Sequence, residues 1–206
     1  MKQAEIDRQN LYSINVQQAF RQAADLVAEA WVSFPEVQAV AVIGSSAQQL
    51  WKEVPRFSSY RRARTEVWHE CGDLDLALWL DSLDRLGELR RASARALLTA
   101  RENSTGFGVV SNLLDIFLFE PGTDRYLGRL CEFNQCPKGK IDCLAPGCGE
   151  IAFNKVISEF KPYADILAEV DRSLLYRRGE GRLRSALDLP TVDGQDRRGT
   201  SVPGGS

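Results

Sequence analysis

The sequence predicts an α+β fold in which a small mixed β-sheet is flanked by helices. Helices and strands can be told apart here by the spacing of their apolar residues. Helical spacing covers residues 14–34 and 85–101, and strand-like runs cover 37–43, 73–80 and 113–119. With 206 residues, of which 44% are hydrophobic and 26% charged, the chain suits one folded domain. This composition excludes a disordered, collagen-like or coiled-coil chain as a whole.

The N-terminal unit, residues 1–36, is expected to be one amphipathic helix. Phe20 and Val27 belong to its apolar side, and Arg21, Asp25 and Glu29 lie on the opposite, polar side. Pro35 ends the helix, because the residue before a proline is disfavoured in the α region.

Residues 37–120 form the predicted core. The run 37–43 is rich in β-branched residues and stops at Gly44, and the run 73–80 begins by alternating polar with apolar residues, as strands do. Residues 81–84 then turn the chain into the second helix, and Pro121-Gly122 ends the strand 113–119. Val109-Val110 reads as a further short strand. The segment 47–70 between the first two strands is an insertion, with a short helix expected over 47–55.

The C-terminal third is expected to divide into a loop, helices and a tail. Residues 121–150 include a cysteine-rich loop, and 151–189 are predicted to hold helices, over 150–160 and 164–178, that pack on the core. From residue 190 to 206 the chain is rich in Pro and Gly and predicts a disordered tail.

The net charge, the N-terminal segment and the longest uncharged run argue against some classes of function. The formal net charge is −2, so the chain as a whole is not attracted to nucleic acid or to an anionic membrane. Its first twenty residues carry scattered charges and resemble no secretory signal, and its longest uncharged run, 37–51, is too short and polar to span a bilayer. We expect a cytoplasmic protein with no membrane partner.

Three carboxylates are candidates for metal binding. Asp73 and Asp75 lie two residues apart on a strand, so they share a face at about 6.5–7 Å spacing. Asp115 has only apolar neighbours, where an unpaired carboxylate is costly. If the two strands are adjacent, the three groups converge on a site for Mg²⁺ or Mn²⁺. The alternatives are that Asp73 and Asp75 face solvent, and that Asp115 is held by backbone N–H groups.

The strand 37–43 runs directly into Gly44-Ser45-Ser46. Glycine allows close approach of a ligand to the backbone, and exposed N–H groups with serine hydroxyls can hold phosphate.

These segments, in this order, resemble the nucleotidyltransferase superfamily of the DNA polymerase β type. The motifs read VIGSS (42–46), GDLDLAL (72–78) and LLDIFLF (113–119). The resemblance implies that Gly44, Ser45 and Ser46 bind a nucleoside triphosphate, ATP being the expected donor, and that Asp73, Asp75 and Asp115 are catalytic ligands of Mg²⁺ or Mn²⁺. It further implies transfer of a nucleoside monophosphate to an acceptor hydroxyl on a protein, an RNA or a small molecule.

The spacing departs from the family pattern, because 27 residues separate Ser45 from Asp73 where about a dozen are usual. Arg61, Arg62 and Arg64 in this insertion could contact a triphosphate or nucleic acid, or could be a solvated charge run.

Four of the five cysteines fall within eighteen residues, at Cys131, Cys136, Cys143 and Cys148. Four thiolates that fold around one centre are typical of structural zinc, the leading interpretation, with an iron–sulfur cluster and free or redox-active thiols as alternatives. Cys71 stands apart and is expected to be a small buried residue.

Two other functions remain open. One is a catalytically inactive nucleotidyltransferase-like fold that binds a protein partner, for example in a toxin–antitoxin or defence system. The other is a nucleic-acid binder that uses the insertion arginines with Lys138 and Lys140.

Overall fold

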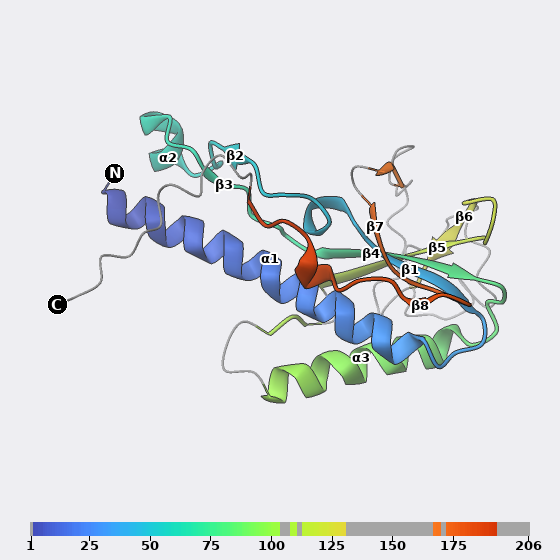
Figure 1. Ribbon diagram of the computed structural model, residues 1–206. Helices are drawn as coiled ribbons and strands as arrows, with labels where there is room; N and C mark the ends of the chain where they lie inside the picture. The colour runs from blue at the N-terminus through green and yellow to red at the C-terminus, as the bar shows by residue number, and fades with distance from the viewer. Residues whose placement is uncertain (1, 104–107, 111–112, 131–166, 170–171, 193–206) are drawn as a thin grey trace, which may run out of the picture.

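The main element of the molecule is a six-stranded mixed sheet (Figure 1). The computed structural model describes residues 2–103, 108–110, 113–130, 167–169 and 172–192. Strand order across the sheet is β6-β5-β4-β1-β7-β8, with β4 parallel to β5 and the other neighbouring pairs antiparallel. The strands are β1 (Val37–Ile43), β4 (Leu74–Leu80), β5 (Leu114–Phe119), β6 (Tyr126–Arg129), β7 (Arg172–Arg177) and β8 (Gly181–Arg182). The predicted α+β class with a mixed sheet is confirmed.

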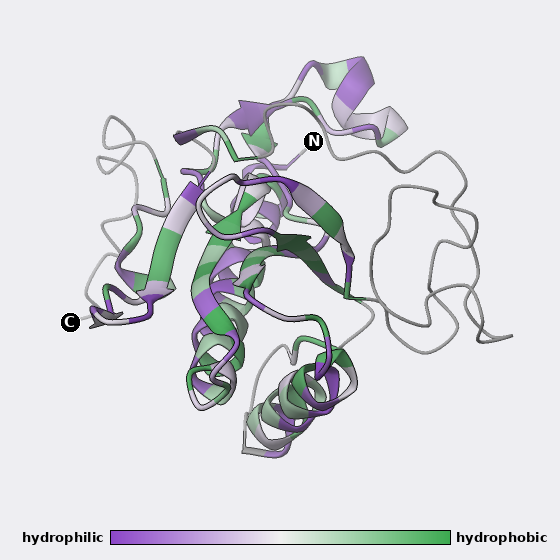
Figure 2. Cartoon of the chain, turned by 90° about the vertical axis from the view of Figure 1, so that its right-hand side faces the viewer, coloured by the Kyte–Doolittle hydropathy of each residue, from purple (hydrophilic) through white to green (hydrophobic). Residues whose placement is uncertain are grey.

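Two long helices, α1 (Gln3–Trp31) and α3 (Leu86–Asn103), pack together against one face of this sheet (Figures 1 and 2). Strand residues that point to this face are apolar and buried, because side chains alternate along a strand. The indole of Trp31 also donates a hydrogen bond to the carbonyl of Leu89, at 2.9 Å. The main core is shared by α1, α3 and alternate residues of the central strands, among them Val40, Val42, Leu76, Leu78, Ile116 and Leu118.

The opposite face of the sheet carries a smaller apolar cluster and the candidate carboxylates. Alternation places Ala77 and Trp79 on the same face as Asp75, and Phe117 and Phe119 on the same face as Asp115. These four apolar residues are buried together with Ala41 and Ile43 of β1. The carboxylates therefore lie at one end of a half-apolar sheet face that neither α1 nor α3 covers.

The insertion packs beside the N-terminal half of α1. It comprises β2 (Lys52–Glu53), α2 (Ser58–Ala63) and β3 (Val67–Trp68), and β2 and β3 form a separate two-stranded sheet. The helix predicted over 47–55 is wrong, because residues 52 and 53 pair with β3 instead. Ser13 donates to the carbonyl of Trp68 at 3.1 Å, and the Trp68 N–H donates to Asn10 at 2.8 Å. These contacts explain why the helix continues N-terminal to residue 14, where the helical spacing of apolar residues begins.

The helix predicted over 164–178, within the predicted helical unit 151–189, is wrong where the structure describes it. Residues 172–177 are strand β7, which pairs with β1, and residues 181–182 form β8. A short apolar run such as Leu174-Leu175-Tyr176 fits helix or strand equally well by spacing. The free edge of β1 decides between them, because its N–H and C=O groups need partners.

The polar side of α1 is also buried, contrary to the amphipathic pattern. Arg21 is 1% and Asp25 9% exposed, whereas Glu29 is exposed as expected. The chain after β8, including the short helix η4 (Ala186–Asp188), returns across this side of α1. Asp25 accepts hydrogen bonds from the hydroxyl of Ser185 and from the N–H of Ala186. A local pattern cannot show that a distant segment will cover a polar stripe.

Residues 190–192, predicted to belong to a disordered tail, pack against the rest of the chain instead. The N–H of Leu50 donates to the carbonyl of Thr191 at 2.8 Å, and Leu50 forms a parallel bridge with Val192. Val109-Val110, expected as a strand, has no regular structure. The four clustered cysteines, the helix predicted over 150–160 and residues 193–206 lie outside the described residues. Within the described ranges, no helix has the length and apolar character needed to cross a membrane.

Candidate metal centre

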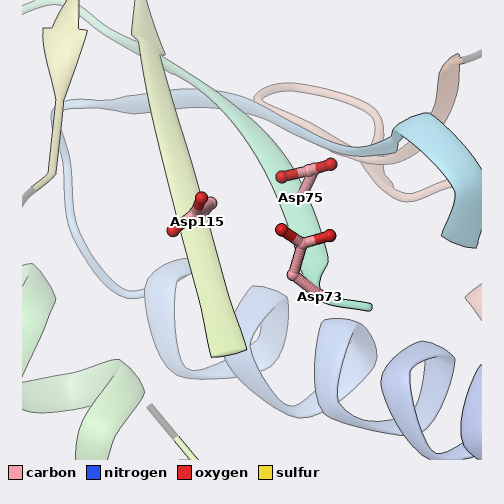
Figure 3. A group of neighbouring side chains, drawn as sticks. All are labelled: Asp73, Asp75 and Asp115. Carbon is pink, nitrogen blue, oxygen red and sulfur yellow. The ribbon is translucent and has the colours of Figure 1, made fainter. Parts of the chain in front are cut away.

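Three carboxylates meet at one end of the sheet face that α1 and α3 leave open. Asp73 directly precedes β4, Asp75 lies in β4 and Asp115 lies in β5 (Figure 3). Because β4 and β5 are parallel and adjacent, Asp75 is the direct register partner of Asp115. One oxygen from each of the three carboxylates lies within 4.8 Å of the others.

The local sequence explains this convergence. Leu74 and Leu76 flank Asp75, and Leu114 and Ile116 flank Asp115; all four leucine and isoleucine side chains are buried in the main core. A slip of one residue in either strand would bury a carboxylate among the helices and expose two apolar side chains. Core packing thus sets the register that brings the three groups together.

Burial and a neighbouring charge both disfavour the charged form of Asp75. Burial, followed by the charge of Asp73, raises the pKa of Asp75 to about 7, against an opposing effect of Arg129. Asp73 is exposed, while Asp75 and Asp115 are half-buried. A cation bound between these oxygens would relieve the repulsion, and oxygen-only ligands are those preferred by hard divalent ions such as Mg²⁺. The residues present therefore fit a Mg²⁺ or Mn²⁺ site.

Arg129, at the end of β6, already supplies one positive charge to this cluster. Its guanidinium forms an ion pair with Asp115, in which the two side chains are 14% and 21% exposed, and lies 5.9 Å from the ring of Phe117. The sequence contained no signal for this residue, because β6 is a four-residue strand that follows a turn. The ion pair therefore competes with a metal ion for the charge of Asp115.

Replacing Arg129 with Gln should therefore strengthen metal binding. At pH 8, above the pKa of Asp75, we expect the Mn²⁺ affinity to rise about fivefold, because a competing charge near the surface is worth roughly 1 kcal/mol. Titration calorimetry with Mn²⁺ measures this. Arg125→Gln is the control, since Arg125 pairs with the exposed Glu120 and not with the cluster. Weaker Mn²⁺ binding by the Arg129 variant would show that Arg129 holds Asp115 in place instead of competing for it.

Gly44 makes the close approach of β1 to Asp75 possible. It directly follows β1 and opens the short helix η1 (Gly44–Ser46), in the left-handed region at φ +65°. Ile43, the residue before it, is the register partner of Asp75. A Cβ atom at position 44 would lie 2.8 Å from Oδ2 of Asp75. Only glycine meets both conditions, the backbone conformation and the contact with the carboxylate.

The substitution Gly44→Ala should weaken metal binding through this contact. We expect the Mn²⁺ affinity to fall about tenfold as the Asp75 carboxylate is displaced, and stability to fall by about 1 kcal/mol from left-handed strain. Gly179→Ala is a matched control, because Gly179 has φ +88° with no atom near its missing Cβ. The control should lose similar stability and keep its Mn²⁺ affinity. Equal affinities in the two variants would show that the close approach is unimportant.

Buried polar side chains of α1 hold the Gly-Ser-Ser turn in position. Gln17 donates to the carbonyls of Ser45 and Gln48, at 3.2 and 2.9 Å. Arg21 donates to the carbonyls of Ser46 and Gln48, at 2.9 and 2.8 Å. Neither residue was identified as part of the site from the sequence, although their spacing of four placed them on one helix face.

The serines of the turn have different surroundings. Ser46 is 1% exposed, and its hydroxyl donates to the carbonyl of Asp73 at 3.3 Å, so this hydroxyl links the turn to the strand that carries the carboxylates. Gly44 and Ser45 are half-exposed at the end of β1. Ser46 therefore has a structural contact, and Gly44 and Ser45 are the turn residues that a ligand could reach.

Other residues were also singled out from the sequence. Cys71 is buried at 2% exposure, as expected, and burial raises the pKa of its thiol. Arg61, Arg62 and Arg64 are exposed on or directly after α2, which fits a solvated charge run. Cys131, Cys136, Cys143 and Cys148 are outside the described residues, as are Lys138 and Lys140.

Comparison of the chain with protein-family models, with curated proteins and with solved structures finds no match. The function of the site has to follow from its own geometry and chemistry.

Proposed function

We propose that this protein is a metal-dependent nucleotidyltransferase, which moves a nucleoside monophosphate from a nucleoside triphosphate to an acceptor hydroxyl. The observation that carries the proposal is the meeting of Asp73, Asp75 and Asp115 within 4.8 Å beside a left-handed Gly44. The three carboxylates supply the ligands for divalent ions, and the glycine turn supplies backbone that a triphosphate can approach closely.

Strand directions support a sheet of the DNA polymerase β type. The strand before the Gly-Ser turn is antiparallel to the strand that carries Asp73 and Asp75, which in turn is parallel to the strand that carries Asp115. This arrangement brings the turn and all three carboxylates to one edge of the same face. The insertion 47–70 between turn and carboxylates is accommodated beside α1, outside the six-stranded sheet.

Asp73, Asp75 and Asp115 would hold one or two Mg²⁺ or Mn²⁺ ions. When bound, such ions neutralise charge on the attacking and leaving oxygens of phosphoryl transfer. Asp75 has to be deprotonated to act as a ligand, so metal affinity should rise with pH until about 7. Gly44 and Ser45 would contact the triphosphate, and Asp115 would orient the acceptor hydroxyl once it is released from Arg129.

We also propose that a structural zinc ion is bound by Cys131, Cys136, Cys143 and Cys148. ATP is the expected donor, and the acceptor is a hydroxyl of a protein, an RNA or a small molecule. We also propose a cytoplasmic location, as the sequence predicts.

A second candidate is a catalytically inactive fold of the same type that binds a partner. The ion pair between Arg129 and Asp115 favours it, because one of the three ligands is engaged by the protein itself. Binding of a nucleotide or protein without pyrophosphate release would identify this second function.

The test is incubation of the full chain with ATP labelled at the α-phosphorus, Mg²⁺ or Mn²⁺, and candidate acceptors. The proposal expects the label on an acceptor or on the protein itself, with pyrophosphate released in equal amount. Asp75→Asn should abolish both signals. Label transfer that survives this substitution would contradict the assigned role of the carboxylates. Labelled ADP formed without pyrophosphate would indicate an ATPase, if free phosphate appears, or a kinase, if the γ-phosphoryl group moves to an acceptor.

A further inference from the structure

A second site lies on the same sheet face as the carboxylates. It is a cavity of about 610 Å³ between β1, β4, β7 and the turn after β5. This volume is in the range of sites for metabolite-sized ligands. Its walls combine apolar and polar side chains, including Gln38, Trp79, Pro121, Asp124, Arg172 and Leu174.

The register of the strands fixes where this cavity lies relative to the carboxylates. Across the sheet, Arg172 of β7 pairs with Ile43, which pairs with Asp75, which pairs with Asp115. Arg172 thus places one end of the cavity in the same row as the carboxylates. The other end is at Trp79, four residues further along β4, or about 13 Å away.

The Gly-Ser turn and the cavity lie on either side of Ile43 along β1. The turn directly follows Ile43, whereas the cavity extends back along β1 toward Gln38. The carboxylates lie beside Ile43, on the neighbouring strand β4 and on β5. A donor triphosphate at the turn and a second ligand in the cavity would therefore both lie next to the carboxylates.

Arg172 gives the cavity a cation that is available to a ligand. Among the described residues, Arg172 forms an ion pair with Asp124 at 3.6 Å, which exceeds hydrogen-bond distance, and its side chain is 29% exposed. Asp124 is itself held by the indole N–H of Trp79, at 2.6 Å. The two other arginines of the cavity are engaged, Arg178 with the carbonyls of Val37 and Phe34 and Arg177 with Glu180.

We infer that this cavity is the acceptor site of the proposed transferase, and that it takes a phosphorylated compound with a flat ring, of which nucleoside monophosphates are the simplest members. The inference rests on the proposed function. Arg172 binds the acceptor's phosphate, as guanidinium groups do, and Trp79 and Leu174 contact the ring. Two carboxylates, those of Glu169 and Asp124, also line the cavity, so Arg172 is the cation that selects for a phosphate.

The transfer step balances as a displacement at the α-phosphorus. The acceptor hydroxyl oxygen forms a bond to that phosphorus, and the bond from phosphorus to the oxygen that bridges to the β-phosphate breaks. Pyrophosphate leaves with the electron pair, and the hydroxyl proton passes to a carboxylate of the cluster and then to water.

The test measures binding of AMP, GMP, CMP and UMP by calorimetry in EDTA. At least one should bind without metal, with affinity at least tenfold lower in Arg172→Gln and partly restored in Arg172→Lys. Arg184→Gln is the matched control, because Arg184 is exposed and does not line the cavity. Pro121→Trp, which fills the cavity from the turn, should also block binding, and Pro121 lies outside the strands.

The outcomes separate this inference from the proposed function. No binding of any monophosphate, or binding unaffected by both Arg172→Gln and Pro121→Trp, overturns the acceptor site even if label transfer from ATP is found. Binding that needs metal and is lost in Asp75→Asn places the ligand at the donor site and also overturns it. Cavity binding in the absence of any label transfer supports the cavity and contradicts the transferase.

Discussion

The substitution Asp75→Asn should abolish turnover and, in the metal-free protein, increase stability. We expect a loss in turnover of roughly 1,000-fold, since the metal contributes several kcal/mol of transition-state stabilisation. Without metal, the asparagine removes a half-buried charge that faces Asp73. Function and stability should therefore change in opposite directions at this one position.

The gain in stability should depend on pH. Asp75 has a pKa of about 7 in the folded chain, above its ordinary value of 3.8, so the folded state holds the proton more tightly than the unfolded state. Stability of the wild type then falls as pH rises from about 4 to about 7, and the variant lacks this loss. Urea unfolding in EDTA measures the difference in free energy of unfolding between the variant and the wild type. This difference should be about 2 kcal/mol more favourable to the variant at pH 8 than at pH 4.5.

Asp115→Asn is the matched control for this prediction. It makes the same change in the same cluster, but Asp115 is the ion-pair partner of Arg129, so its loss should lower stability at pH 8. If the two variants changed stability in the same direction, the assignment of the repulsion to Asp75 would be wrong.

Arg21→Met should be the most destabilising substitution outside the apolar core. The guanidinium of Arg21 donates to four carbonyls, those of Ser46, Gln48, Leu189 and Pro190. Methionine fills much of the volume but removes the donor from the carbonyls of Ser46, Leu189 and Pro190, while Gln48 keeps a hydrogen bond from Gln17. We expect the free energy of unfolding to fall by about 3 kcal/mol. This figure allows for the opposing gain from no longer burying the charged guanidinium.

Urea unfolding followed by circular dichroism measures this loss. Arg8→Met provides the control, since Arg8 is exposed on the same helix and the change is chemically identical. Hydrogen exchange at the amide of Leu50, which bonds to Thr191, should accelerate in the Arg21 variant as the C-terminal segment detaches. A loss below about 1 kcal/mol, or unchanged exchange, would show that Arg21 does not hold these segments together.

The central strands could be predicted from sequence because each is an apolar run of strand length, bounded by turn residues. β1 matches its predicted bounds, and β4 and β5 each begin one residue later than predicted. The convergence of Asp73, Asp75 and Asp115 follows from the same runs. An acidic residue between buried apolar neighbours must be directed to the opposite face, and two such strands side by side bring their carboxylates together.

What could not be predicted depends on contacts between distant parts of the chain. Strand β7 has no local signal that distinguishes it from a helix; the open edge of β1 determines its structure. Arg129 reaches Asp115 only because β6 pairs with β5. Arg21 is buried because the segment after β8 returns across α1, 168 residues further along the chain at Leu189.

Binding of Mn²⁺, followed by electron paramagnetic resonance at pH 8 in the presence of a non-hydrolysable ATP analogue, tests the carboxylate site most directly. The account predicts one or two Mn²⁺ ions bound per chain, most of this binding lost in Asp75→Asn, and metal-dependent retention of the analogue. A wild-type protein that retains no Mn²⁺, or one that retains as much as the Asp75 variant, would contradict it.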